Sequence, residues 1–564
     1  MKHYNIKFAF IKFFLLLLIV SPFIYSLVLN HVYHLQLLDL SIWQHINSIE
    51  HALKKETAPL YTLGVYVALL TPLTGFLPRL GVRGEYGSAA FADDTLIKKM
   101  KLFEKKGIVL GKKGSKLLRY SDPLSCLVLA PPNTGKSSSI SVPNLLLLEA
   151  STFAFDIKGE LFEITSKYRK EKYNSKIYKF NPLDKDCVKF NPLDKSIIGD
   201  IFDENHNLII EKWAIVEEIV NEVAYLIYPE KENYDYWSEE GRNIFILLAL
   251  WLIYKNGSTS IPEIRSFSMQ DFISLYPEYP YEDNTDPLIF FLYIEIQKEE
   301  NDDFFSCSVP ARIKEEVIAI KKKADKEYSG VYGSFKSPLN IFSNPIIAEN
   351  FSSNELVIED FRKEISSLYI SIKEKDLKPL RMVNRLFIEF NLRRLLSVLP
   401  NKNDLDIVGI YDEFPRFEKL DYLMEVPSLG RGYKKLSIFI AQDYAQIKKI
   451  YGQETLDILE STTAYKVIFP QNNKETAKRY AEIIGDFTVE RRSESRSLDT
   501  KGSRSIQKQL LGQKLITEQD LLSLDKDTIY ILATNNYKNP IKAKPYRYFE
   551  DKKLLKELDH ANKI

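Results

Sequence analysis

The sequence contains little cysteine: Cys126, Cys187 and Cys307 are the three cysteines in 564 residues. They lie far apart in the chain and lack the short spacings that cysteine metal ligands have. This usage argues against a disulfide framework and a cysteine-based metal site, and it suits the reducing cytosol. Cys126 lies within an apolar run and is expected in the core.

The sequence also lacks an excess of charge of either sign, with 77 Lys and Arg against 76 Asp and Glu. Proteins that bind nucleic acid over their whole surface carry a large basic excess. A global basic footprint is therefore absent, although the composition still permits a local basic channel. The length allows two to four domains and a large hydrophobic core.

Two long apolar runs lie near the N-terminus, at residues 8–29 and 60–77. Each has about the length that spans a bilayer as a helix. The first run is also compatible with a signal peptide, and both runs are compatible with buried core helices. Basic residues flank the outer ends of the pair, whereas fewer lie between the runs. The positive-inside rule then predicts a two-pass anchor over residues 1–80, with both termini in the cytoplasm and a short periplasmic loop.

The stretch from 124 to 148 reads as strand, loop and helix. Residues 124–129 are apolar, as in a buried strand. Residues 130–137 read APPNTGKS and match the phosphate-binding pattern G-x-x-x-x-G-K-[ST], with Ala130 at the first glycine position. Residues 138–148 can form a helix, in which Pro143 is the weak point. The predicted nucleotide-binding residues are Ala130, Pro131, Pro132, Asn133, Thr134, Gly135, Lys136 and Ser137.

The residue types in this loop suit phosphate chemistry. Backbone N–H groups of the loop and of the helix N-terminus point at an anion. Lys136 would reach the β- and γ-phosphates, and the Ser137 hydroxyl would ligate Mg²⁺. The alternative is an ordinary strand-to-helix turn.

A second motif, DIVGIYDE at residues 406–413, supplies the acidic half of such a site. Residues 407–411 are apolar, as in another buried strand. Asp412 would hold Mg²⁺, and Glu413 would orient or deprotonate the attacking water. The alternative is a pair of surface acids at a strand end.

The rest of the chain alternates short apolar strands with helices. This pattern predicts an α/β fold whose mostly parallel sheet is covered on both faces. Residues 209–228, 238–254 and 313–328 have helical spacing, so residues 203–335 are expected to form a mostly helical insertion. The predicted strands lie at residues 107–111, leading towards the phosphate loop, and at 152–156, 176–180, 367–372, 436–441, 465–469 and 528–532. Residues 490–513 are polar and rich in Arg and Ser, and are predicted to form a mobile loop.

Further motifs carry a specific resemblance. The chain contains GSAAFA at 87–92, DIKGE at 156–160, FNPL at 190–193, GRGY at 430–433 and IAQDYAQ at 440–446, besides the two motifs above. In this order they resemble the coupling ATPases of type IV secretion systems, which recruit substrates in conjugation and effector export. The resemblance extends over nearly the whole chain.

The resemblance implies a RecA-like P-loop NTPase that uses ATP and Mg²⁺ and assembles as a homo-hexamer with nucleotide between subunits. Residues 81–202 and 336–564 would form the RecA-like domain, and residues 203–335 an inserted all-α domain. Gln442 would sense the γ-phosphate. Arg431, expected at the same sheet edge as the nucleotide, would act as an arginine finger on a neighbouring subunit.

The implied function is that of a coupling protein in the bacterial inner membrane, with most of the chain cytoplasmic. Its partners would be other secretion-channel subunits, a relaxase–DNA complex or effector proteins, and single- or double-stranded DNA bound without sequence specificity. The sequence does not distinguish DNA cargo from protein cargo. Two alternatives are a septal-type DNA translocase and a non-motor membrane receptor whose nucleotide site is regulatory.

Overall fold

The computed structural model describes residues 86–230, 234–267, 296, 309–496 and 504–563. The predicted membrane spans, 8–29 and 60–77, lie outside these residues. None of the helices in the described part of the chain combines the length and apolarity needed to cross a bilayer. The chain divides into two compact units, residues 1–88 with 487–513, and residues 89–486 with 514–564.

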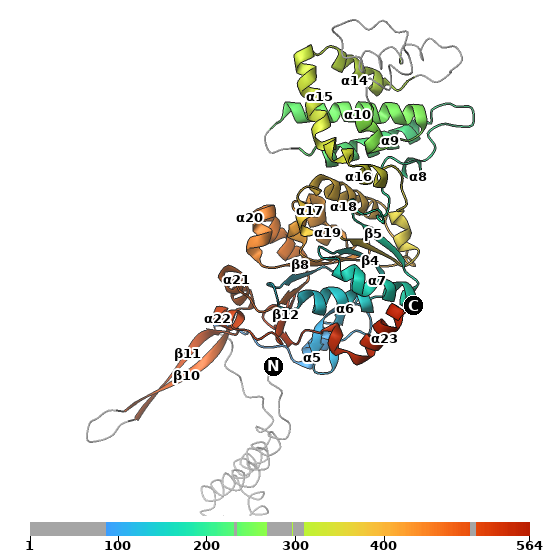
Figure 1. Ribbon diagram of the computed structural model, residues 1–564. Helices are drawn as coiled ribbons and strands as arrows, with labels where there is room; N and C mark the ends of the chain where they lie inside the picture. The colour runs from blue at the N-terminus through green and yellow to red at the C-terminus, as the bar shows by residue number, and fades with distance from the viewer. Residues whose placement is uncertain (1–85, 231–233, 268–295, 297–308, 497–503, 564) are drawn as a thin grey trace, which may run out of the picture. The chain divides into compact units, whose positions relative to one another are not determined.

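The larger unit is built on one mixed sheet. Among the described residues, nine strands pair in the order β13-β12-β9-β3-β8-β7-β4-β6-β5 (Figure 1). All neighbours from β9 to β5 pair in parallel, whereas β12 is antiparallel to both β9 and β13. The predicted mostly parallel sheet is therefore confirmed. The strands are β3 (Cys126–Leu129), β4 (Ser151–Phe155), β5 (Lys176–Phe180), β6 (Ser366–Ile370), β7 (Ile407–Tyr411), β8 (Lys435–Ala441), β9 (Tyr465–Ile468), β12 (Ile529–Ala533) and β13 (Ile541–Ala543).

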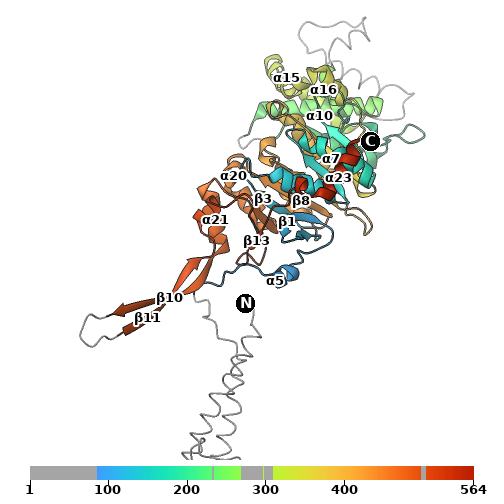
Figure 2. The same ribbon diagram turned by 60° about the horizontal axis from the view of Figure 1, so that its bottom comes forward.

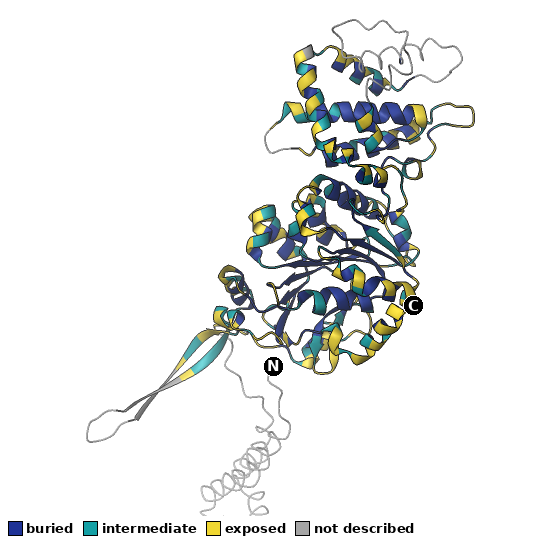
Figure 3. Cartoon of the chain, in the orientation of Figure 1, coloured by how far each residue is buried: buried dark blue, intermediate teal, exposed yellow. Residues whose placement is uncertain are grey.

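Both faces of the sheet are covered, as Figure 3 shows by the dark blue of its strands. Side chains alternate between faces along a strand, so Leu127 and Leu129 enter one core cluster while Cys126 and Val128 enter another. Figure 1 places α6 and α7 on one side of the sheet and α18 to α20 on the other. The covering helices are α6 (Val142–Leu147), α7 (Glu160–Tyr173) and α23 (Lys552–Lys563), and α18 (Arg381–Leu395), α19 (Asp421–Leu429), α20 (Tyr444–Thr462) and α21 (Lys474–Ile484).

The strand predicted at 107–111 lies outside this sheet. As β1 (Ile108–Lys113), it pairs antiparallel with β2 (Lys116–Tyr120). The side chain of Asn144 in α6 holds it in place, because Asn144 accepts from the Val109 amide at 2.8 Å and donates to the Val109 carbonyl at 2.9 Å. At its far end the Lys112 amide donates to the Lys544 carbonyl at 2.8 Å, so β1 lies beside β13 (Figure 2).

Between β5 and β6 the described residues form mainly helices. The helices are α8 (Lys195–Ile198), α9 (Ile210–Ile227), α10 (Tyr236–Asn256), α11 (Ile261–Ser266), α14 (Ala311–Lys321), α15 (Asp325–Leu339) and α16 (Pro345–Asn350). The two helices predicted at 209–228 and 238–254 are confirmed as α9 and α10, whereas residues 313–328 belong to two helices, α14 and α15. Gly241 permits close packing of α10 on α15, since a Cβ there would lie 2.8 Å from the Phe335 amide nitrogen. The helices extend beyond residue 335, as far as α16.

The described part of the smaller unit consists of residues 86–88 and nearly all of a two-stranded sheet, β10 (Asp486–Arg496) paired with β11 (Arg504–Lys514). The prediction of a mobile loop over 490–513 is therefore wrong for these strands. The prediction relied on polar composition, whereas a strand pair is held by backbone N–H···O=C hydrogen bonds, which polar residues form as well as apolar ones. Thr488 joins β10 to residues 86 and 87. Its hydroxyl accepts from the Tyr86 amide at 3.2 Å and donates to the Gly87 carbonyl at 3.0 Å.

Candidate nucleotide site at the carboxyl edge of the sheet

The three predicted site segments meet because β3, β7 and β8 are parallel neighbours. The loops that follow parallel strands emerge at one edge of the sheet. The phosphate loop follows β3, Asp412 and Glu413 follow β7, and Gln442 follows β8, which lies between the other two. The Ala130 amide donates to the Ala441 carbonyl at 3.0 Å and joins the first loop to the end of β8.

The phosphate loop is shaped by two residues with left-handed backbone, Asn133 at φ 62° and Gly135 at φ 79°. Asparagine and glycine are the residues that adopt this region most readily. The Thr134 hydroxyl donates to the Pro131 carbonyl at 2.7 Å and closes the turn. Prolines have no amide N–H, so the loop's phosphate donors begin at Asn133. Anion binding thus concentrates in the second half of the loop.

The helix after the loop starts with a wide turn. Residues Ser137–Ser141 form a π-helical turn, and α6 continues from Val142 with Pro143 in its first turn. A proline has no N–H to donate to the preceding turn, so it fits where the hydrogen-bond spacing changes from i−5 to i−4. The predicted helix is confirmed, and Pro143 marks the change of helix type rather than a break.

Lys136 and Glu413 form an ion pair across this edge. The distance from Lys136 Nζ to Glu413 Oε1 is 2.5 Å, and the two side chains are only 10% and 23% exposed. Burial acts to raise the pKa of Glu413, but the hydrogen bond and charge of Lys136, aided by Arg416, hold it below its usual value. Glu413 is therefore a charged carboxylate at neutral pH, held directly beside the phosphate loop.

Asp412 has one satisfied and one unsatisfied oxygen. Its Oδ2 accepts from the Ser137 hydroxyl at 2.8 Å and from the Ser141 hydroxyl at 2.9 Å. Its Oδ1 is buried and has no hydrogen-bond partner. Burial raises the pKa of Asp412, and Lys136 opposes that rise. A nearby cation, or water bound to one, would satisfy the second oxygen.

This donor set fits Mg²⁺. The ion takes hard oxygen ligands and commonly binds one or two carboxylates together with substrate phosphates. Asp412 and Ser137 supply a carboxylate and a hydroxyl in contact with each other. Groups of three or more His, Cys, Asp or Glu side chains that would form an all-protein metal cage are absent from the described residues.

Two neighbours of the site were not predicted. Ser141 shares Asp412 with Ser137, and its signal in the sequence is the spacing of four residues, which puts both hydroxyls on one helix face. Arg416 Nε lies 3.7 Å from Glu413 Oε2, and the same side chain also pairs with Glu374. Arg416 lies three positions after Glu413, but the sequence does not show that the turn folds back.

The structure separates the two remaining site residues. Gln442 is half-buried next to the phosphate loop, with its amide N–H donating to Gln446 Oε1 at 3.0 Å. Arg431 is exposed beyond the end of α19, where the Gly430 carbonyl accepts from the Lys435 amide at the amino end of β8. The seven residues of β8 span about 20 Å at roughly 3.3 Å each. The prediction that Arg431 lies at the nucleotide edge of its own sheet is therefore wrong.

Residues 84–564 match the family described as Type IV secretory system Conjugative DNA transfer. Protein VirD4 of Agrobacterium fabrum is 25% identical over 456 residues, which are 80% of this chain and 63% of VirD4. The conjugal transfer protein TraG of Escherichia coli is 24% identical over 429 residues, 72% of this chain and 60% of TraG. The chain thus spans less than two thirds of each of these two relatives.

Solved structures share the fold. The bacterial conjugative coupling protein TrwBdeltaN70 superposes with a TM-score of 0.53 at 16% identity, over 83% of this chain and 97% of that one. The plasmid coupling protein TrwB in complex with ADP and Mg²⁺ gives a TM-score of 0.52 at 16% identity, over 82% and 97%. At this low sequence identity, the two superpositions show a shared α/β fold.

Proposed function

The chain belongs to the type IV secretory system conjugative DNA transfer family, and on this premise we propose that it is an ATP-hydrolysing coupling protein. It would recruit DNA–protein or effector-protein cargo and drive it to a secretion channel. The observation that carries the proposal is the joining of Lys136 to Glu413 and of Ser137 to Asp412 at one sheet edge.

ATP and Mg²⁺ are the cofactors that this edge suits. The relative TrwB has been solved with ADP and Mg²⁺ and with a non-hydrolysable ATP analogue. In this chain the loop from Ala130 to Ser137 would hold the phosphates, while Ser137 and Asp412 would hold the ion. Bound Mg²⁺ supplies positive charge that neutralises the phosphate oxygens.

The ion pair between Lys136 and Glu413 suggests how binding prepares hydrolysis. The 2.5 Å contact would weaken if Lys136 Nζ moved towards the β- and γ-phosphates of a bound nucleotide. When Lys136 turns to the phosphates, Glu413 loses its closest hydrogen-bond donor. Its carboxylate is then available to orient a water and accept that water's proton. Nucleotide binding and formation of the general base would be one event.

Gln442 and Arg431 receive different roles from their positions. Gln442, between the phosphate loop and the acidic pair, would contact the γ-phosphate. Arg431 lies at the opposite edge of the sheet and is exposed, so it is suited to a nucleotide held by another subunit. A cation that approaches the γ-phosphate from outside stabilises transition-state charge. This arrangement calls for a ring, and a homo-hexamer is the proposed assembly.

The remaining parts complete the proposal. Residues 1–80 would anchor the chain in the bacterial inner membrane with two passes, leaving the rest in the cytoplasm. Residues 81–202 and 336–564 would form the RecA-like motor. The helical insertion, 203–335, would contact cargo or its adaptors, which are DNA–protein complexes, effector proteins or both.

Cargo capture tests this function. Cells would carry either the natural chain or the Lys136→Ala variant, with a photocrosslinker in the helical insertion. We expect both forms to capture cargo and only the natural form to deliver it, with nucleic acid and protein scored separately. Delivery by Lys136→Ala cells at the natural rate would contradict the motor function.

A further inference from the structure

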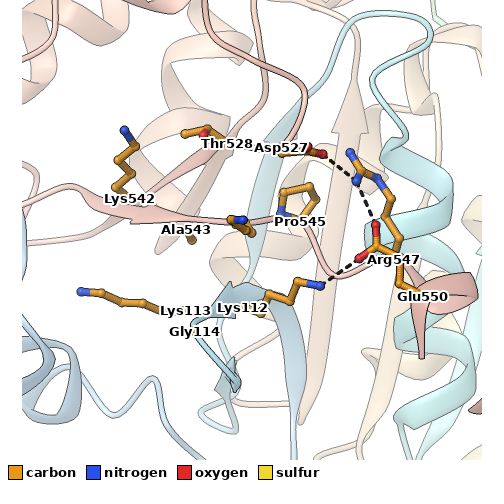
Figure 4. A pocket seen from close by; sticks show the side chains of 11 residues that line it. Lys112, Lys113, Gly114, Asp527, Thr528, Lys542, Ala543, Pro545, Arg547 and Glu550 are labelled. Atoms are coloured by element: carbon orange, nitrogen blue, oxygen red, sulfur yellow. Dashed lines mark hydrogen bonds and ion pairs between the residues drawn. The ribbon is translucent and has the colours of Figure 1, made fainter. Parts of the chain in front are cut away.

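A cleft of about 580 Å³ opens beside the phosphate loop. It lies between the β1–β2 turn, the residues before β12, and the segment that runs from β13 into the short helix η8 (Tyr548–Glu550) (Figure 4). Its volume falls within the roughly 300–1,000 Å³ of small-molecule sites. None of the site residues predicted from the sequence lines it, so its role is not covered by the catalytic edge.

The cleft adjoins the place where a nucleotide leaves the phosphate loop. Helix η8 contacts the π-helical turn Ser137–Ser141, and Arg547 Nε lies 3.9 Å from the position that a Cβ on Gly135 would occupy. In a loop of this kind the phosphates lie over the loop and the first turn of the helix. The ribose attached to the α-phosphate must then extend past this turn, on the side where Arg547 and Glu550 lie.

The guanidinium of Arg547, which lines the cleft, is held by bonds to Asp527 and Glu550 that Figure 4 shows. Its Nη1 donates to Asp527 Oδ1 at 2.7 Å and to Glu550 Oε1 at 3.0 Å, and its Nη2 donates to the Lys526 carbonyl at 2.9 Å. Lys112 Nζ fixes the other oxygen of Glu550 at 2.9 Å. A guanidinium whose donors are satisfied around its edge presents its flat face for stacking.

The chemistry of these side chains suits a nucleoside. Nucleobases stack on guanidinium planes, and carboxylates such as Asp527 and Glu550 accept hydrogen bonds from ribose hydroxyls. We propose that this cleft holds the nucleoside part of the bound nucleotide, with Arg547 stacked on the base. The inference rests on the proposed nucleotide function, which it extends from the phosphates to the base and ribose.

Basic residues along the cleft would also suit a ligand without a nucleoside. Lys113, Lys542 and Lys544 add positive charge to its walls. Such charge would also attract free polyphosphate, so the experiment compares ligands with and without a nucleoside. Calorimetric titration of the full-length chain with ADP and with inorganic pyrophosphate, both with Mg²⁺, separates the two contributions.

Two substitutions of Arg547 isolate stacking from charge. Arg547→Ala removes both, whereas Arg547→Lys keeps a cation and removes the plane. We expect both variants to lose about tenfold in ADP affinity while pyrophosphate affinity changes less than about twofold. Arg479→Ala is the matched control, because Arg479 also bonds two carboxylates, Asp457 and Glu460, and lies on α21 away from the cleft. It should bind both ligands as the natural chain does.

Each result has a defined meaning. Natural affinity for both ADP and pyrophosphate in Arg547→Ala would overturn the inference and leave the phosphate site standing. Equal weakening of both ligands would also overturn it, since Arg547 would then only support the loop. Failure of the natural chain to bind either ligand would overturn the proposed function, and the inference with it.

Photolabelling gives a reading that needs no substitution. The natural chain is irradiated with 8-azido-ADP and Mg²⁺, and the labelled peptides are identified by mass spectrometry. We expect the label within residues 526–550 or at the β1–β2 turn, and its loss on addition of excess ADP. Label confined to other segments would overturn the inference.

Discussion

Lys136 and Lys435 are both buried lysines, but they lie at opposite edges of the same sheet. At the carboxyl edge, Lys136 has Glu413 at 2.5 Å. At the amino edge, Lys435 Nζ has no hydrogen-bond partner and lies 5.7 Å and 5.5 Å from the ring centres of Phe153 and Tyr411. Burial, reinforced by Arg362, lowers the pKa of Lys435 to about 7.

The difference shows which surroundings keep a buried lysine charged in this fold. A buried cation beside a carboxylate and a phosphate loop can exchange the carboxylate for a bound phosphate, so its positive charge can stabilise that phosphate. A buried cation between aromatic rings has only weak attraction to offset its lost hydration, and it tends to lose its proton.

Lys136→Ala should reduce ATP hydrolysis by about 10³-fold, because the loop loses the cation that stabilises the phosphates. Steady-state phosphate release by the purified chain measures this. The fold should persist, although the melting temperature should fall, because Glu413 loses its partner in a largely buried ion pair. Turnover at the natural rate would show that the carboxyl edge is not the catalytic site.

Arg431→Ala should also lower hydrolysis, by roughly 10³-fold at the strong end of arginine fingers. Arg431 is exposed at the amino edge, so any action on a nucleotide would have to be on one held by a neighbouring subunit. Mixing Arg431→Ala with Lys136→Ala subunits should restore part of the activity, because some interfaces then combine an intact loop with an intact arginine.

The mixing experiment requires proof of co-assembly, for example by co-purification through different tags. A co-assembled mixture without recovery would mean that Arg431 is structural. Arg381→Ala is a suitable control, since that side chain is also an exposed arginine and its one close carboxylate, in Glu418, lies at 4.0 Å.

Glu413→Gln should lower turnover by about 10²-fold or more while ATP binding persists, since the amide keeps the shape but cannot accept the proton. Binding by calorimetry and hydrolysis by phosphate release should therefore separate. Normal hydrolysis by this variant would transfer the role to another acid, with Glu418 the first to examine.

Lys435→Met should stabilise the protein by about 1–3 kcal/mol near neutral pH, because it removes a buried amine without a partner. The sign follows from proton binding. Between the folded pKa of about 7 and the unfolded value of 10.5, the unfolded chain binds more protons, so the natural chain gains stability as pH rises. Thermal unfolding from pH 7 to 10 should show that gain in the natural chain and less of it in Lys435→Met. Parallel pH profiles would mean that Lys435 keeps its proton when folded.

Much of the fold was predictable because buried parallel strands are short apolar runs. Residues 407–411 are predicted and observed with the same limits, and the strands from β3 to β9 agree within two residues at either end. The helices α9 and α10 were also visible from their apolar spacing. The strands of 486–514 were missed, since their polar side chains give no such pattern and their stability comes from backbone pairing.

The chemistry available to this protein is set by short local patterns in its sequence. The loop ending in Gly135, Lys136 and Ser137, and the acids Asp412 and Glu413, are local patterns whose residue types specify phosphate and metal binding. Which of these side chains come into contact depends on the tertiary structure. The placement of β8 between β3 and β7 joins Lys136 to Glu413, and the return of α19 across the sheet carries Arg431 to the far edge. The nearness of Arg547 to Gly135, more than 400 residues apart in the chain, likewise depends on the order of strands, which long-range packing sets and local sequence does not encode.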